Sequence, residues 1–193
     1  HHLVQMQDAV GVAASLTDVG RYHRAEFVRP AAHCLVGHID ALLREQILDV
    51  MALEGIRASV DDVVVTTGSQ HGLELVTKLF IDPGDVVLDE GPSYVTALVV
   101  FRSFQADVQH VMTDEYGLVP DALREHIAAL KREGRRIKFL YTIPTFGNPS
   151  GVTMSWERRV EILEICRSEG ILVLEDDPYG LLWFDGPPPH AMR

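Results

Sequence analysis

Short apolar runs alternate with segments of helical periodicity along most of this chain, and this alternation is the feature that most restricts the possible fold. The apolar runs predict strands, and the periodic segments predict helices. The predicted strands are 63–66, 86–88, 107–111, 137–142 and 171–174, and the predicted helices are 40–55, 70–80, 94–101, 121–132 and 156–168. Residues 171–174 are four consecutive apolar residues between Gly170 and Pro178, which predicts a strand buried on both faces. Alternating strands and helices favour a mainly parallel sheet covered on both faces. We therefore predict a three-layer, doubly wound α/β fold.

Composition restricts the class of protein and its partners. The 193 residues are 47% hydrophobic and 23% charged, which is typical of a globular protein. The formal net charge is -11 and the 17 Lys and Arg are scattered, so we expect no nucleic-acid partner. No apolar run reaches the roughly 20 residues of a membrane-spanning helix, so we expect no membrane partner. Cys34 and Cys166 show no metal-ligand spacing, which suits a reducing cytoplasm.

The chain divides into two predicted parts. Residues 1–39 have weak periodicity and predict an N-terminal arm. Residues 40–193 contain the strand and helix pattern, and no linker or repeat interrupts them. We therefore predict one arm and one α/β domain.

The loop after the first predicted strand has the features of an anion site. Gly68 provides a tight turn, and Ser69 and Gln70 then open a helix. Free backbone N–H groups and a hydroxyl at a helix start can bind a phosphate. The simpler alternative is that Ser69 only caps the helix.

The later loops also carry polar or aromatic side chains directly after strands. These are Tyr94 in a Pro-Ser-Tyr turn, Asn148 in a rigid loop with two prolines and two glycines, and Asp176 and Tyr179 after the last strand. Taken singly, each suits an ordinary packing or turn role. The carboxyl ends of parallel strands share one edge, however, where α/β sheets bind ligands. A phosphate cradle, an aromatic ring, an amide and a carboxylate at one edge fit pyridoxal 5'-phosphate.

These motifs also carry a family resemblance. In this order they resemble the fold type I pyridoxal-phosphate-dependent aminotransferases of class I and II, and within them the branch of kynurenine and 2-aminoadipate aminotransferases. The motifs are Thr67-Gly68-Ser69-Gln70, Pro92-Ser93-Tyr94, Asn148-Pro149-Ser150-Gly151 and Asp176-Asp177-Pro178-Tyr179.

The resemblance implies a role for each site residue. The Ser-Gln pair at the helix start would hold the cofactor's phosphate, and Tyr94 would stack on its pyridine ring. Asn148 and Tyr179 would hydrogen-bond the ring's phenolic oxygen. Asp176 would pair with the ring nitrogen and keep it protonated. Asp176 is preferred over Asp177 because the aspartate and tyrosine of the family are three residues apart.

The resemblance also implies what such a protein needs in addition. The family forms a Schiff base through a lysine that we expect beyond Arg193, so no catalytic residue is assigned here, and the chain is expected to be inactive alone. Its lysines, Lys78, Lys131 and Lys138, lie in no such motif. Residues 40–193 would be the N-terminal part of the large domain. The implied partners are amino-acid and 2-oxo-acid substrates, and either a second copy in a homodimer or a complementing C-terminal half.

Two alternatives to an enzyme remain. One is a non-catalytic, aminotransferase-like binding or scaffold protein. The other is the effector domain of a GntR-type transcription regulator, which shares this fold. Residues 1–29 are few for the basic DNA-binding domain of such a regulator, and its asparagine loop commonly lacks the Asn148-Pro149 pair. The substrate, and the choice between transamination, elimination and decarboxylation, are left open by the sequence.

Overall fold

The computed structural model describes residues 34–192, so the predicted arm lies mostly outside the described residues. The elements are α1 (Cys34–Leu53), the 3-10 helix η1 (Val60–Asp62), α2 (Ser69–Phe80), β1 (Val86–Gly91), α3 (Val95–Ser103), β2 (Asp107–Asp114), β3 (Gly117–Leu118), α4 (Pro120–Arg132), β4 (Ile137–Thr142), α5 (Trp156–Glu169) and β5 (Leu172–Glu175). None of these helices is long and apolar enough to cross a membrane.

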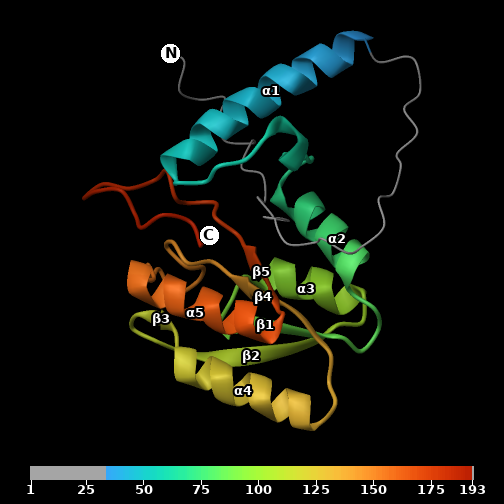
Figure 1. Ribbon diagram of the computed structural model, residues 1–193, viewed down its shortest axis with the longest axis vertical. Helices are drawn as coiled ribbons and strands as arrows, with labels where there is room; N and C mark the ends of the chain where they lie inside the picture. The colour runs from blue at the N-terminus through green and yellow to red at the C-terminus, as the bar shows by residue number, and fades with distance from the viewer. Residues whose placement is uncertain (1–33, 193) are drawn as a thin grey trace.

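The strands form one sheet in the order β3-β2-β1-β4-β5 (Figure 1). β1, β2, β4 and β5 are parallel, and only the short β3 runs antiparallel, beside β2. The first crossover leads from β1 through α3 to β2 on one side. The chain then returns to the other side of β1 with β4 and β5. The direction therefore reverses between β1 and β4, whose carboxyl ends flank a topological switch point.

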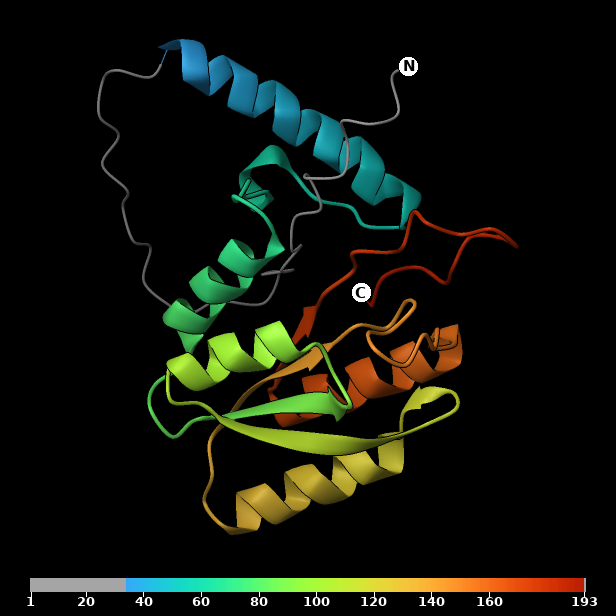
Figure 2. The same ribbon diagram turned by 180° about the vertical axis from the view of Figure 1, so that it is seen from behind.

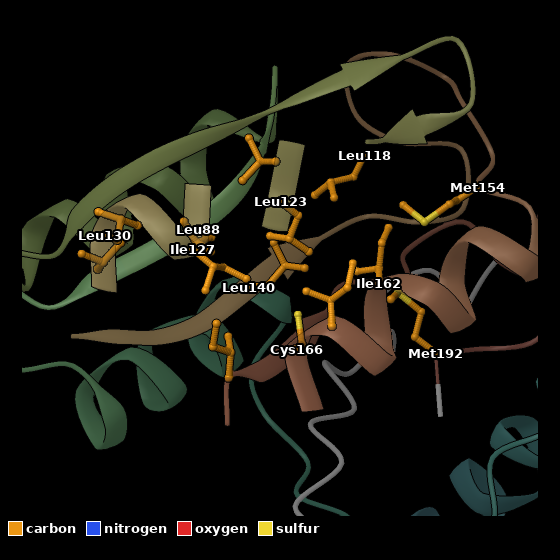
Figure 3. Packing of buried hydrophobic residues seen from close by; sticks show 14 residues of the cluster. Leu88, Leu118, Leu123, Ile127, Leu130, Leu140, Met154, Ile162, Cys166 and Met192 are labelled. Carbon is orange, nitrogen blue, oxygen red and sulfur yellow. The ribbon is translucent and has the colours of Figure 1, made fainter. Parts of the chain in front are cut away.

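Two apolar clusters hold helices on opposite faces of this sheet. On one face, Leu88 and Leu140 of the sheet pack with residues of α4 and α5 such as Ile127 and Ile162 (Figure 3). On the other face, residues of α2 and α3 pack on β1 and β4, and this second cluster contains Leu73, Phe101 and Tyr141. The helices α2 and α3 thus lie across the sheet from α4 and α5. This arrangement confirms the doubly wound α/β prediction.

Most element predictions are confirmed with shifts of a few residues, but the predicted strand 63–66 is wrong. Residues 63–66 form no strand. A strand needs a neighbour to bond to, and none of the described strands pairs with this segment. Val64 is 66% exposed, whereas Val63 is buried. The apolar run therefore reflects one buried residue within an otherwise exposed connection.

Two further differences concern the sheet edges. Residues 171–174 were expected to form a strand buried on both faces, but β5 is an edge strand in the described sheet and Leu172 is 37% exposed. β3 was not predicted because two residues carry no periodicity. The N-terminal helix also begins at Cys34, before the expected start at residue 40.

Candidate functional site

A buried carboxylate joins the strand ends at the switch point. Glu90, near the end of β1, accepts hydrogen bonds from the Ile143 N–H at 2.6 Å and from the Thr142 hydroxyl at 3.0 Å. Burial raises the pKa of Glu90, although both hydrogen bonds oppose this shift. The carboxyl ends of β1 and β4 are therefore fixed relative to each other, and the loops that leave them start from a rigid base.

The turn after β1 places Tyr94 at the start of α3. The Gly91–Pro92 peptide is cis, and Tyr94 is the N-cap residue of α3. Its half-buried side chain packs against the apolar cluster that contains Tyr141. One part of Tyr94 is thus anchored in the core, while the rest stays accessible at the strand end.

Asn148 lies in the loop after β4, and backbone groups on either side of it are hydrogen-bonded to each other. Gly147 N–H donates to the Val152 carbonyl at 2.8 Å, and Met154 N–H donates to the Pro144 carbonyl at 2.8 Å. The Asn148–Pro149 peptide is cis, and Asn148 is half-buried. This loop is irregular and internally bonded, as its prolines and glycines predicted.

The two aspartates after β5 have different surroundings. Asp176 is 5% exposed, and its Oδ2 accepts a hydrogen bond from the Tyr141 hydroxyl at 2.7 Å. Asp177 Oδ1 instead accepts the backbone N–H groups of Tyr179 at 3.3 Å and Gly180 at 2.8 Å. Burial raises the pKa of both carboxyl groups. Asp177 therefore caps its own turn, whereas Asp176 faces the neighbouring strand.

Helix α2 begins with the predicted Ser-Gln pair. Its N-cap residue is Gly68, with φ +92°, so no side chain caps the helix, and the position of a Cβ on Gly68 is open space. Ser69 is half-buried and Gln70 is exposed. One turn later, Leu73 enters the same cluster as Tyr141. In both views, the start of α2 lies on the side of the sheet from which the chain leaves β5 (Figure 1, Figure 2).

The six predicted residues are connected to one another by different kinds of contact. Tyr94 and Asp176 both neighbour Tyr141, one through the apolar cluster and the other through a hydrogen bond. Asn148 and the half-buried Tyr179 lie on loops that leave adjacent strands. The Ser-Gln pair is connected to them through the packing of α2, with no direct hydrogen bond among the described residues.

A small cavity lies at the switch point. Its volume is about 20 Å³, and its lining includes Glu90, Pro92, Ile143, Ser150 and Met154. This volume suits about one water molecule. The cavity is therefore too small to hold a cofactor.

One residue that supports the site was not predicted from the sequence. It is an arginine that hydrogen-bonds both to the loop after β4 and to the chain near His190. Arg159 of α5 is 1% exposed and donates to the carbonyl oxygens of Met154 at 3.0 Å and Pro144 at 2.9 Å. It also donates to the Thr145 hydroxyl at 2.9 Å and to the His190 carbonyl at 3.0 Å. Helical spacing with the apolar residues of α5 at 162 and 166 could have placed it on the buried face.

The lysines lie away from the strand ends. Lys138, at the beginning of β4, pairs with Asp85 at 3.2 Å, and Lys131 of α4 forms an ion pair with Glu169. Lys78 is exposed on α2, near its carboxyl end. The beginning of β4 is at the opposite edge of the sheet from Asp176. None of the three lysines is therefore placed beside the candidate site.

Known proteins share both sequence and fold with this chain. The 2-aminoadipate transaminase of Thermus thermophilus is 41% identical over 137 residues, which is 71% of this chain and 33% of that protein. A crystal structure of kynurenine aminotransferase from Pyrococcus horikoshii is 38% identical, with a TM-score of 0.73 over 78% of this chain and 37% of that chain. The HTH-type transcriptional regulator YisV of Bacillus subtilis is 32% identical over 78% of this chain and 30% of its own length.

The chain spans between 30 and 50% of the length of the curated relatives that it matches. The model of the family "Aminotransferase class I and II" matches residues 25–192, which is most of the sequence. The matched region contains all the strands of the sheet and every predicted site residue. The chain therefore belongs to the class I and II aminotransferase family.

Proposed function

We propose that this chain is the N-terminal part of the large domain of a pyridoxal-phosphate-dependent aminotransferase. The observation that carries the proposal is the position of Asp176, a buried carboxylate at the carboxyl end of β5 that receives a hydrogen bond from β4. It lies next to the switch point, where α/β sheets bind ligands. An amino acid and a 2-oxo acid are the proposed substrates.

The residues present fit the cofactor. The start of α2 offers backbone N–H groups beside the open space at Gly68, which suits a phosphate. Tyr94 would stack on the ring, and Asn148 and Tyr179 would bind its phenolic oxygen. When bound, the cofactor supplies an electron sink for the negative charge that develops at the substrate's α-carbon.

Asp176 has the central role in this proposal. A carboxylate beside the pyridine nitrogen would hold a proton there, because the charged pair stabilises the protonated ring. Asp177 is a weaker candidate, since its carboxylate already binds two N–H groups of its own turn. The surroundings therefore favour Asp176 as the partner of the ring nitrogen, and the three-residue spacing to Tyr179 favours the same residue.

Comparison of Asp176→Asn with Asp177→Asn tests this assignment. A charge-assisted hydrogen bond contributes about 1.5–3 kcal/mol, so Asp176→Asn should weaken pyridoxal phosphate binding by roughly tenfold or more. Asp177→Asn should lower stability and change the affinity by less than about threefold. The measurement is an absorption titration of each variant at pH 7. Equal affinities, or a larger loss in Asp177→Asn, would contradict the role of Asp176.

We also propose that amino-group transfer requires a lysine from another polypeptide segment, because the lysines of this chain lie away from the site. We expect that segment beyond Arg193, in the C-terminal part of the protein or in a complementing C-terminal half. Exposed apolar side chains near residue 182, including Leu182 and Phe184, are consistent with such a partner. A homodimer and a cytoplasmic location are further parts of this proposal.

A second candidate is a cofactor-binding domain without catalysis, and the 32% identity with the regulator YisV favours it. Both candidates use the same ring site, so cofactor binding alone does not separate them. Turnover of 2-aminoadipate or kynurenine by the chain mixed with the C-terminal half of a related aminotransferase would support the enzyme. Cofactor binding without turnover in that mixture would favour the second candidate.

A further inference from the structure

Tyr141 stands out among the buried residues that have no role in the resemblance. It lies on β4, between β1 and β5, and it is fully buried. Its ring packs edge-on against Phe101, with centroids 5.3 Å apart and an interplanar angle of 72°. Its position is therefore set by the packing of the core.

The hydroxyl of this anchored ring has one recorded partner, Asp176. The O–H donates to Asp176 Oδ2 at 2.7 Å, a typical length for a bond to a carboxylate. In the part of the chain that the structure describes, this bond occupies Oδ2 and leaves Oδ1 without a hydrogen bond. The carboxylate thus has one oxygen fixed by the protein and one oxygen that can receive a ligand.

The charges around this pair explain why the hydrogen bond matters. Burial and the neighbouring Asp177 both favour the neutral form of Asp176, and the Tyr141 hydroxyl is the interaction that favours its charged form. Burial, Asp176, Glu90 and Tyr94 raise the pKa of Tyr141, so its hydroxyl stays protonated. The hydroxyl has a single proton, and in this geometry it points to Asp176.

We propose that Tyr141 is a positioning residue that keeps the Asp176 carboxylate ionised and oriented, so that Oδ1 can receive the protonated nitrogen of the cofactor ring. The inference rests on the proposed function and extends it to a residue on the adjacent strand. Tyr141 makes no contact with substrate in this scheme and acts only through Asp176.

The variant Tyr141→Phe removes the hydroxyl and keeps the ring. Tyr116→Phe is the matched control, because Tyr116 is 61% exposed and lies in the connection between β2 and β3. The first readout is the pKa of Asp176, measured by carboxyl carbon NMR without cofactor. We expect it to rise by about one unit in Tyr141→Phe and to stay unchanged in the control.

The second readout is the affinity for pyridoxal phosphate at a pH at least one unit below the Asp176 pKa that the first readout gives for the wild-type chain, because the free carboxyl is then protonated in both proteins and binding has to ionise it. We expect Tyr141→Phe to bind roughly tenfold more weakly, which corresponds to one pKa unit. An unchanged Asp176 pKa would overturn the inference, and so would a raised pKa with unchanged affinity. If the wild-type chain bound no cofactor, the proposed function would fail, whereas the first readout would still decide whether Tyr141 keeps Asp176 ionised.

A milder substitution guards against a folding defect in Tyr141→Phe. Replacing Tyr141 by 3-fluorotyrosine makes the phenol a stronger hydrogen-bond donor with almost no change of shape. We expect the pKa of Asp176 to fall, in the direction opposite to that in Tyr141→Phe. A rise or no change would overturn the inference.

Discussion

Replacing Arg159 by methionine should destabilise the domain more than any other single arginine substitution on α5. The guanidinium makes four hydrogen bonds, of 2.9 to 3.0 Å, to the loop after β4 and to the chain near His190. It also lies 3.8 Å from the Glu175 carboxylate. Methionine fills a similar volume but donates nothing, so these buried acceptors lose their partner.

The expected loss follows from the burial of this group. Removing one partner of a buried charged network costs about 3–5 kcal/mol, because the remaining polar groups stay buried without compensation. For a domain of this size, 1 kcal/mol shifts the melting temperature by roughly 2–4 °C, so the shift should be on the order of 10 °C. The loop that carries Asn148 should also become more mobile, since two of the four bonds end on Pro144 and Thr145.

The adjacent Arg158 provides the control. It forms an ion pair with the partly exposed Asp114, and surface pairs of this kind contribute about 0.2–1 kcal/mol. Urea unfolding of Arg159→Met and Arg158→Met, followed by circular dichroism, compares the two losses directly. Equal losses, or a loss below about 1 kcal/mol in Arg159→Met, would refute the view that Arg159 holds the loops together.

Two other predictions concern pH and backbone strain. Burial raises the pKa of Glu175 from 4.5 to about 7. The folded chain therefore binds this proton more tightly than the unfolded chain, and the contribution of Glu175 to stability should be fully present below pH 4.5 and be lost as pH rises through 7. In urea unfolding, Glu175→Gln should reduce the difference in unfolding free energy between pH 5 and pH 8. An unchanged difference would contradict the raised pKa of Glu175. Gly68→Ala should cost about 1 kcal/mol, because φ is +92°, and should weaken cofactor binding. The control is Gly134→Ala, at φ +69° after α4, which should lower stability by a similar amount and leave cofactor affinity unchanged. If both substitutions changed cofactor affinity equally, the anion site at Gly68 would be contradicted.

Helices and strands were predicted correctly where local features of the sequence define them, namely hydrophobic periodicity and the glycines and prolines at their ends. The strand at 137–142 matches β4, and α4 and α5 begin and end within one residue of their predicted limits. The strand at 63–66 failed because an apolar run cannot reveal whether a partner strand lies beside it. The edge position of β5 was missed for the same reason, since the order of strands depends on contacts between distant segments.

The candidate site was predictable to a similar extent. The order of the motifs placed Tyr94, Asn148 and Asp176 after strands, and parallel pairing of β1, β4 and β5 brings those strand ends to one edge. The supporting contacts were not predictable. Tyr141 and Asp176 are 35 residues apart, and nothing local to either residue indicates that they meet.

The most direct test of the cofactor site is to map backbone amide shifts in NMR spectra as pyridoxal phosphate is added. We predict saturable shifts at the non-proline residues of 69–71, 94–97, 145–151 and 176–180, at the carboxyl edge of the sheet. Residues 84–86 and 135–137, at the amino edge, serve as internal controls and should not move. Shifts confined to the amino edge, or no saturable shifts at all, would contradict the proposal that this sheet edge binds the cofactor.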